Sequence, residues 1–203
     1  MITLPAADTI EAVCFDCFGT LLSVAEGPYA YRKLVSTAAD RTAMRNTVLT
    51  RSRSFERHAQ SAGWNAREIA AAQVALAEEL ASIQVLDRAR EVLEALRLKG
   101  LKIALCSNLA SEFGPAALKQ LQFLFDTTVL SYEVGLTKPN PAIFRVVCRN
   151  LHCTPNKVLM VGDSLKADIA GAREAGMHAL HVNRTSSASS SDLTHLAQLN
   201  DLL

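Results

Sequence analysis

The sequence has little net charge, no long apolar run and no basic, apolar leader. Its 21 Lys and Arg residues stand against 20 Asp and Glu residues, giving a formal charge of +1, so no bulk field attracts nucleic acid or anionic membrane. No apolar run approaches the ~20 residues of a membrane-spanning helix, and residues 1–12 lack the pattern of a signal peptide. We therefore expect a cytoplasmic protein that has no nucleic-acid or membrane partner.

The cysteines do not suggest a disulfide framework. There are five of them, an odd number, and Cys14, Cys17 and Cys106 lie in apolar, strand-like runs, which suits reduced and buried thiols. With 203 residues, 49% of them hydrophobic, the chain can bury one core, or one core with a small insertion.

Four short apolar runs end in polar or glycine-containing turns and are typical of buried parallel strands. They cover residues 10–16, 101–108, 157–164 and 178–183. Helical patterns lie between them, for example over residues 87–100, where the helix is expected to stop at a glycine. Strands alternating with helices predict an α/β fold, a doubly wound, Rossmann-like parallel sheet.

Residues 25–82 interrupt this alternation, because they are helical in pattern throughout and contain no convincing strand. We interpret them as an inserted α-helical cap on a core formed by residues 1–24 and 83–203. The cap would lie over the carboxyl ends of the strands, where open α/β sheets bind ligands. Near the end of the chain, a serine-rich connection over 185–192 precedes a short predicted helix over 193–203.

Polar side chains stand at the ends of the predicted strands or in the loops that follow them. They are Asp16, Ser107, Lys138, Asp163 and Asp168. Each has an ordinary alternative when taken singly, since Ser107 or Asp163 could cap a helix and Lys138 could be a solvated loop charge. Because parallel strands bring their carboxyl ends together, we expect the five to form one site.

Four stretches, "FDCFGTLL", "CSN", "GLTKPNPAIF" and "VGDSLKADIAGA", resemble the ordered motifs of the haloacid dehalogenase superfamily of hydrolases over nearly the whole chain. The resemblance implies a helical cap after the first motif and an aspartyl covalent intermediate, which splits one hard displacement into two easier steps. It makes Asp16 the nucleophile, and Ser107 and Lys138 the groups that hold the transferring group. Asp163 and Asp168 would join Asp16 around Mg²⁺, with Asp168 also supporting Lys138.

The resemblance implies supporting roles as well. The hydroxyl of Thr20 would help orient the nucleophile, and Asn108 would contact the substrate beside the motif serine. The backbone carbonyl of Phe18 would complete the oxygen ligands that Mg²⁺ prefers. In the cap, "YAYRKL" places Arg32 beside aromatic residues, as dehalogenase caps place an arginine that binds a carboxylate; a solvated basic helix face is the alternative.

Phe18 departs from the phosphatase pattern. Phosphatases of this superfamily usually carry a second aspartate two residues after the nucleophile, and that aspartate protonates the leaving alkoxide. A phenyl ring donates no proton, and general acid assistance is typically worth about 10²- to 10⁴-fold. We therefore expect weak activity on alkyl phosphates and a preference for leaving groups that are already acidic.

Two alternatives to a phosphatase stay open at this point. The first is a metal-independent 2-haloacid dehalogenase, a branch with an aromatic residue at this position but with neutral groups in its fourth motif. Ionised Asp16, Asp163 and Asp168 beside one lysine would give about −2, which repels a carboxylate substrate and attracts a divalent cation. The second alternative is a regulatory or binding module with degraded catalysis. We favour a Mg²⁺-dependent phosphatase that acts on a small phosphorylated metabolite, as a monomer or homodimer.

Overall fold

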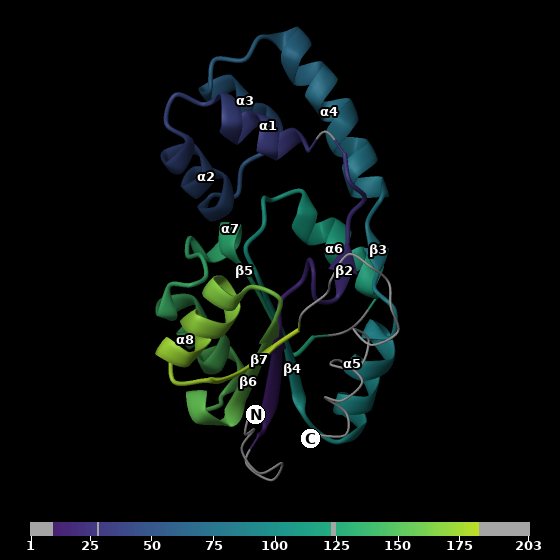
Figure 1. The fold of residues 1–203 in the computed structure, drawn as a ribbon, viewed down its shortest axis with the longest axis vertical. Helices are drawn as coiled ribbons and strands as arrows, with labels where there is room; N and C mark the ends of the chain where they lie inside the picture. The colour runs from purple at the N-terminus through teal and green to yellow at the C-terminus, as the bar shows by residue number, and fades with distance from the viewer. Residues whose placement is uncertain (1–9, 28, 123–124, 183–203) are drawn as a thin grey trace.

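A five-stranded parallel sheet forms the centre of the molecule in the computed structural model, which describes residues 10–27, 29–122 and 125–182 (Figure 1). The strand order is β5-β4-β1-β6-β7, and every pairing is parallel. The strands are β1 (Ala12–Phe15), β4 (Lys102–Ser107), β5 (Thr127–Leu130), β6 (Val158–Gly162) and β7 (His178–His181). The predicted α/β class is confirmed, whereas the predicted serine-rich connection and last helix lie outside the described residues.

Helices cover both faces of this sheet, so the central strand is apolar along its whole length. Val13 and Phe15 of β1 face the apolar cluster that contains α5 and α6, while Ala12 and Cys14 face the cluster that contains α8 and α9. Figure 1 shows α5 and α8 on opposite sides of the sheet. These helices are α5 (Ala89–Leu98), α6 (Phe113–Leu121), α8 (Pro141–Leu151) and α9 (Gly171–Glu174).

A separate group of four helices stands above the carboxyl ends of the strands (Figure 1). It is entered and left through β2 (Leu22–Ser23) and β3 (Gln84–Val85), two short strands that pair antiparallel and hold the two connections side by side. We propose that this group is the predicted cap over residues 25–82. Its helices are α1 (Ala30–Thr37), α2 (Arg41–Thr50), α3 (Phe55–Ser61) and α4 (Ala66–Ala81).

The cap has an apolar cluster of its own, which also takes in Ala110 of the core. Tyr31 and Leu34 of α1, Phe55 of α3 and Leu76 of α4 are buried in it. The aromatic rings pack edge to face, with the ring centroids of Tyr31 and Phe55 5.1 Å apart and those of Phe55 and Trp64 6.0 Å apart. The four helices therefore bury a common apolar interior.

Three short helical segments complete the core. They are α7 (Ser131–Val134), the 3₁₀ turn η2 (Pro155–Lys157) and the π-helix η3 (Leu165–Ala170). The helix predicted over 87–100 is confirmed as α5, and Gly100 follows it at a φ of +81°, which favours glycine.

The cysteines match the prediction of buried thiols. Cys14, Cys17, Cys106 and Cys148 are buried and Cys153 is partly buried, and all five are free. Among the described residues, no helix has the length and apolar character needed to cross a membrane.

Candidate active site

The five predicted site residues line one cavity of about 480 Å³ between the cap and the carboxyl ends of the strands. Asp16 follows β1, Ser107 ends β4 and Asp163 follows β6, while Lys138 precedes α8 and Asp168 lies in η3. Residues that are up to 152 positions apart in the sequence are thus brought together, because the parallel strands end at one edge of the sheet.

Lys138 ties the centre of the site together. Its Nζ lies 2.5 Å from Oδ1 of Asp16 and 2.6 Å from Oδ1 of Asp168, and it donates a hydrogen bond of 2.8 Å to the carbonyl of Cys106. The Ser107 hydroxyl donates to the same Oδ1 of Asp16 at 3.1 Å. All of these side chains are buried, so one oxygen of Asp16 is held by a cation and a hydroxyl in a site largely shielded from water.

The electrostatics of these groups follow from burial and close charges. Burial opposes the charge of Lys138, but the carboxylates of Asp16 and Asp168 outweigh it and raise the pKa of this lysine above its ordinary value. Burial also raises the pKa of Asp168, against the pull of Lys138. The pKa of Asp163 is raised by burial and by the two nearby carboxylates.

Three carboxylates converge where a cation could bind. One oxygen each of Asp16, Asp163 and Asp168 lies within 4.8 Å of the others, and carboxylate oxygens are the ligands that Mg²⁺ prefers. Gly19 makes room for this arrangement, since a Cβ built there would stand 2.2 Å from Oδ2 of Asp163. Nε2 of His181 lies 2.9 Å from the backbone oxygen of Asp163 and braces this strand end. The donor set therefore fits Mg²⁺.

Hydrogen bonds fix the two loops that carry Ser107 and Lys138. The Asn108 side chain donates to the backbone oxygen of Lys138 at 2.9 Å and accepts from its backbone N–H at 2.8 Å. One residue further on, the backbone N–H of Leu109 donates to the buried hydroxyl of Ser131 at 3.0 Å. Asn108 thus locks the loop after β4 to the lysine loop, and it also lines the cavity.

The first motif supplies an aromatic wall. Phe18 is half-buried, lines the cavity and packs edge to face on Phe113, with ring centroids 5.7 Å apart. Thr20 is fully buried, and among the described residues it is not part of the cavity wall. The roles of Thr20 and of the Phe18 carbonyl stay predictions.

The cap contributes charged side chains to the same cavity. Arg32 lies over the ring of Tyr29, with 4.4 Å between its guanidinium carbon and the ring centroid, and both residues line the cavity. Glu79 of α4 also lines it and accepts a hydrogen bond of 3.3 Å from the backbone N–H of Ala30. Burial raises the pKa of Glu79. The sequence pointed to Arg32 and its aromatic neighbours but not to Glu79, because the position of Glu79 resembles an ordinary helix-surface position.

One carboxylate of the core holds the cap. Glu112, directly before α6, accepts hydrogen bonds of 2.5 Å from the hydroxyl of Tyr31 and from the backbone N–H of Phe55. The neighbouring Ser111 hydroxyl donates to the backbone oxygen of Arg53 at 2.5 Å. The loop that follows Ser107 is therefore also hydrogen-bonded to α1 and to the start of α3. Glu112 was missed by the sequence analysis, since nothing local marks it.

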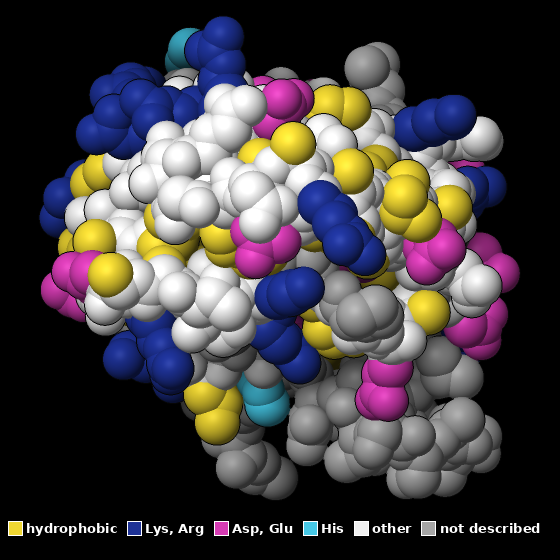
Figure 2. Space-filling view, turned by 90° about the horizontal axis from the view of Figure 1, so that it is seen from above, with side chains coloured by type: hydrophobic (Ala, Val, Ile, Leu, Met, Phe, Trp, Pro, Cys, Tyr) yellow, Lys and Arg dark blue, Asp and Glu magenta, His cyan; other side chains and the backbone are white. Residues whose placement is uncertain are grey.

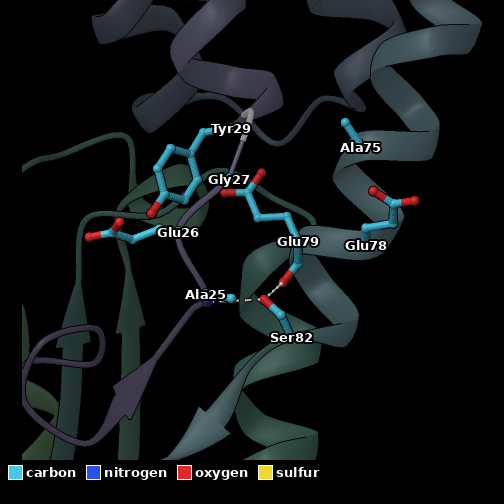
Figure 3. A pocket seen from close by; sticks show the side chains of 8 residues that line it. All are labelled: Ala25, Glu26, Gly27, Tyr29, Ala75, Glu78, Glu79 and Ser82. Carbon is cyan, nitrogen blue, oxygen red and sulfur yellow. Dashed lines mark hydrogen bonds between the residues drawn. The ribbon is translucent and has the colours of Figure 1, made fainter.

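A smaller recess of about 230 Å³ adjoins the cavity and shares Tyr29 and Glu79 with it. Figure 3 shows this recess between the connection that follows β2 and helix α4, with Glu26, Glu78 and Glu79 around it. No lysine or arginine belongs to the described lining of this recess. A phosphate group would be repelled there, so the recess is a poor candidate for an anion site.

Comparison with known proteins identifies the family of this chain. The family of haloacid dehalogenase-like hydrolases matches residues 10–176. A glyceraldehyde 3-phosphate phosphatase of Methanothermobacter thermautotrophicus is 37% identical over 90 residues, which are 43% of this chain and 40% of that protein. A phosphoserine phosphatase of Thermus thermophilus is 32% identical over 139 residues, or 66% of this chain and 55% of that protein. The chain thus spans only about half or less of these phosphatases.

Three further proteins are similar over most of the chain. An (S)-2-haloacid dehalogenase 4A of Burkholderia cepacia is 27% identical over 200 residues, 87% of this chain and 84% of that protein. Among solved structures, a HAD phosphatase from Thermococcus onnurineus has a TM-score of 0.61 at 26% identity, covering 89% of this chain and 90% of that one. A 2-haloacid dehalogenase from Pseudomonas syringae pv. Tomato DC3000 has a TM-score of 0.67 at 22% identity, covering 95% and 97%, which supports the fold alone.

Proposed function

The chain belongs to the haloacid dehalogenase-like hydrolases, and from this premise we propose that it is a Mg²⁺-dependent phosphatase with Asp16 as its nucleophile. The observation that carries the proposal is the convergence of Asp16, Asp163 and Asp168 within 4.8 Å of one another. Among the described residues Lys138 is the one cation paired with them, so these groups leave an excess of negative charge. Such a site favours a divalent cation and disfavours a free carboxylate substrate.

Asp16, Asp163 and the backbone carbonyl of Phe18 would hold the Mg²⁺ ion, with Asp168 next to it and bonded to Lys138. When bound, the ion supplies positive charge that offsets the charge of the phosphate and lets it approach the carboxylates. The Asp168 carboxylate also accepts a hydrogen bond of 2.9 Å from the backbone N–H of Ser164, so its orientation is fixed from two sides.

The residues of this chain suit a two-step transfer. Ser107 and Lys138 hold Oδ1 of Asp16, which leaves Oδ2 to attack phosphorus while the bond from phosphorus to the leaving oxygen breaks. That oxygen departs with the electron pair, and Lys138 and Ser107 stabilise the charge on the transferring group. In the second step water attacks phosphorus and the bond to Asp16 breaks, with its electron pair returning to the carboxylate. Inorganic phosphate leaves and carries the proton of the water.

Phe18 sets the expected leaving group. No acid occupies its position, so the departing oxygen must carry its own charge or take a proton from water. Aryl and acyl phosphates leave as stabilised anions and suit this site better than alkyl phosphates do.

The substrate-binding residues and the substrate class belong to this proposal. We assign substrate binding to Ser107, Asn108 and Lys138 in the core and to Arg32 in the cap, and a small phosphorylated metabolite as the substrate. The phosphatases among the similar proteins support that substrate class. A supporting role for Thr20, a cytoplasmic location and a monomeric or homodimeric state stay predictions.

A 2-haloacid dehalogenase is the second candidate function. Two observations favour it: the similarity to the Burkholderia cepacia dehalogenase over 87% of this chain, and an aromatic residue at position 18. Against it, the carboxylate of a haloacid would have to approach the Asp16, Asp163 and Asp168 cluster without a compensating cation. The structure therefore favours the phosphatase.

The test is turnover, with and without Mg²⁺, on 4-nitrophenyl phosphate, an alkyl phosphate and 2-chloropropionate, with Asp16→Asn as the blank. We expect phosphate release that needs Mg²⁺, is fastest for the aryl ester and is lost in Asp16→Asn. Asp163→Ala should lose the Mg²⁺-dependent activity, and its Mg²⁺ binding measured by calorimetry should be weaker. Chloride release without metal would overturn the phosphatase in favour of a dehalogenase.

A further inference from the structure

A second cavity of about 360 Å³ adjoins the central one and has no described lining residue in common with the acidic recess of Figure 3. It shares Asn108, Lys138, Ser164 and Ala167 with the central cavity, so the two spaces meet at the reacting groups. Helix α2 of the cap forms one wall, and the loop after β6 with the start of η3 forms the other. A molecule bound over Asp16 could extend into this space.

The walls of this second cavity are basic. Arg45 of α2, Lys166 of η3 and Lys138 all line it, and its described lining contains no carboxylate. Within the described part of the chain, Arg45 and Lys166 form no ion pair closer than 4.0 Å. Thr42 and Asn46 add polar side chains beside Arg45. The space thus offers two uncompensated cations and neutral hydrogen-bonding groups.

The two cations are attached to fixed parts of the molecule. Lys166 follows Ser164, whose hydroxyl accepts a hydrogen bond of 3.0 Å from the backbone N–H of Ala167 and so begins η3. Arg45 lies in α2, which begins with a side-chain cap from Asp40 and packs against α7 of the core. Their spacing from the reacting centre is therefore set by the fold, even though both side chains are exposed.

We propose that this basic cavity is a subsite for a second anionic group, a carboxylate or a further phosphate, on the leaving part of the substrate. The inference rests on the proposed phosphatase function and narrows its substrate to phosphate esters with two acidic ends. The transferring phosphate lies at Asp16, Ser107 and Lys138, and the second anion lies between Arg45 and Lys166. The acidic recess, which adjoins the central cavity at Tyr29 and Glu79, repels that second anion and so orients the substrate.

Binding of non-hydrolysable phosphonates to the whole protein with Mg²⁺ tests this inference without turnover. Isothermal titration calorimetry would compare n-propylphosphonate with 3-phosphonopropionate, in which a carboxylate replaces the terminal methyl group, and with propane-1,3-bisphosphonate. A five-carbon pair, pentylphosphonate and 5-phosphonopentanoate, covers a longer reach. We expect at least one compound with two anionic ends to bind roughly 10-fold more tightly than the matched compound with one anionic end. Each of the two exposed ion pairs contributes only modestly to the binding free energy.

The variant Arg45→Gln/Lys166→Gln should abolish this preference and leave the affinity for propylphosphonate unchanged. Arg41→Gln is the matched control, because Arg41 is exposed in the same helix and lines none of the described cavities; it should keep the preference. The carboxylate and bisphosphonate arms distinguish which second anion the subsite takes.

Three results would overturn the subsite. If propylphosphonate binds but no second anion improves binding at either length, the subsite fails while the phosphatase proposal survives. If the double variant weakens all phosphonates equally, the two cations attract anions generally and do not form a subsite. If no phosphonate binds with Mg²⁺, the proposed function and the subsite fail together.

Discussion

Lys138, Asp16 and Asp168 of the core are paired with one another, whereas Arg32 and Arg45 of the cap face open space. In the core, Lys138 lies 2.5 and 2.6 Å from two carboxylates, and all three side chains are buried. In the cap, Arg32 and Arg45 are exposed and line cavities. The core thus arranges its reacting groups before substrate arrives, while the cap keeps its charges for the substrate.

The two regions also differ in how their positions are fixed. Strand pairing holds the core groups, since β1 pairs with both β4 and β6. The described part of the cap has no such ladder; the two-residue pairing of β2 with β3 joins its entry and exit, and Glu112 bonds it to the core. Figure 2 looks onto the cap end and shows basic and acidic side chains interspersed with apolar ones. Changes in the core should therefore abolish chemistry, and changes in the cap should alter binding.

The largest effect is expected from Lys138→Met, which breaks the paired charges of the core. The change leaves two buried carboxylates without their cation, and breaking a buried ion pair typically costs about 3–5 kcal/mol of stability. Phosphate release should fall by at least about 10³-fold, because the charge on the transferring group loses its stabilising partner. Urea unfolding and 4-nitrophenyl phosphate turnover measure the two effects.

Lys157→Met is the matched control, since Lys157 pairs with Glu11 at an exposed site. It should change neither stability nor turnover appreciably. Equal losses in the two lysine variants would show that the buried pairing has no special importance.

Phe18→Asp should have the next largest effect and tests whether the residue at position 18 of the core sets the leaving-group preference. Phe18 lines the cavity and packs on Phe113, so an aspartate there would stand where a leaving oxygen needs a proton. We expect turnover of an alkyl phosphate to rise about 10²-fold relative to 4-nitrophenyl phosphate, the lower end of general acid assistance. Phe18→Asn, which removes the ring without adding an acid, should show no such change in ratio; a rise with Asn as well would refute the argument.

The sequence could predict the parts of the molecule that leave a local signature. Four strands and the residues at their ends were predicted because buried strands are apolar runs that break at polar groups, and Asp16, Ser107 and Asp163 do lie together. Strand β5 was missed, since it is a short edge strand whose first two residues, Thr127 and Thr128, are only half-buried.

Contacts between distant segments left no such signature. Glu112 bonds to Tyr31, 81 residues away, and to Phe55, 57 residues away, and nothing in the letters around it distinguishes it from a solvated glutamate. Arg45 and Lys166 likewise face one cavity only because α2 of the cap lies over the loop after β6. Such pairings depend on how the cap sits on the core, which no local pattern encodes.

Glu112→Ala should have a moderate effect that is confined to binding. The change removes hydrogen bonds to Tyr31 and to the backbone of Phe55, so α1 loses an anchor and Arg32, next in sequence, loses its fixed position. We expect KM to rise roughly 10-fold with little change in kcat, since hydrogen bonds to a charged group contribute about 1.5–3 kcal/mol each.

Fluorescence gives an independent readout, because Trp64 is the sole tryptophan and packs on Phe55. Its emission should shift in Glu112→Ala. The emission of Glu112→Gln, which keeps one acceptor oxygen, should lie between that of the unchanged protein and that of Glu112→Ala. Glu94→Ala, an exposed carboxylate of α5, is the control. A shift in emission with an unchanged KM would contradict a positioning role.

The smallest effect should come from His58, whose side chain is buried in the cap with 1% of its surface exposed. Its Nε2 has no hydrogen-bond partner among the described residues. Burial lowers the pKa of His58; the charge of Arg53 lowers it further, and the charge of Glu112 only partly offsets them. His58 of the unfolded chain therefore binds a proton as the pH falls below about 6.5, whereas His58 of the folded cap stays neutral to a lower pH. Stability contributed by the neutral imidazole is present above that pH and is lost as the pH falls below it.

We therefore expect the urea midpoint reported by Trp64 to fall on acidification below about pH 6.5. His58→Gln, which is polar but does not titrate in this range, should flatten that dependence, while the exposed His152→Gln should keep it. The edge-to-face ring contact with Tyr31, at 6.2 Å between centroids, makes this histidine part of the same cap interior that Glu112 anchors. An acid sensitivity unchanged in His58→Gln would place its origin in the carboxylates of the core, and the contrast between a charge-paired core and a neutral cap interior would then fail.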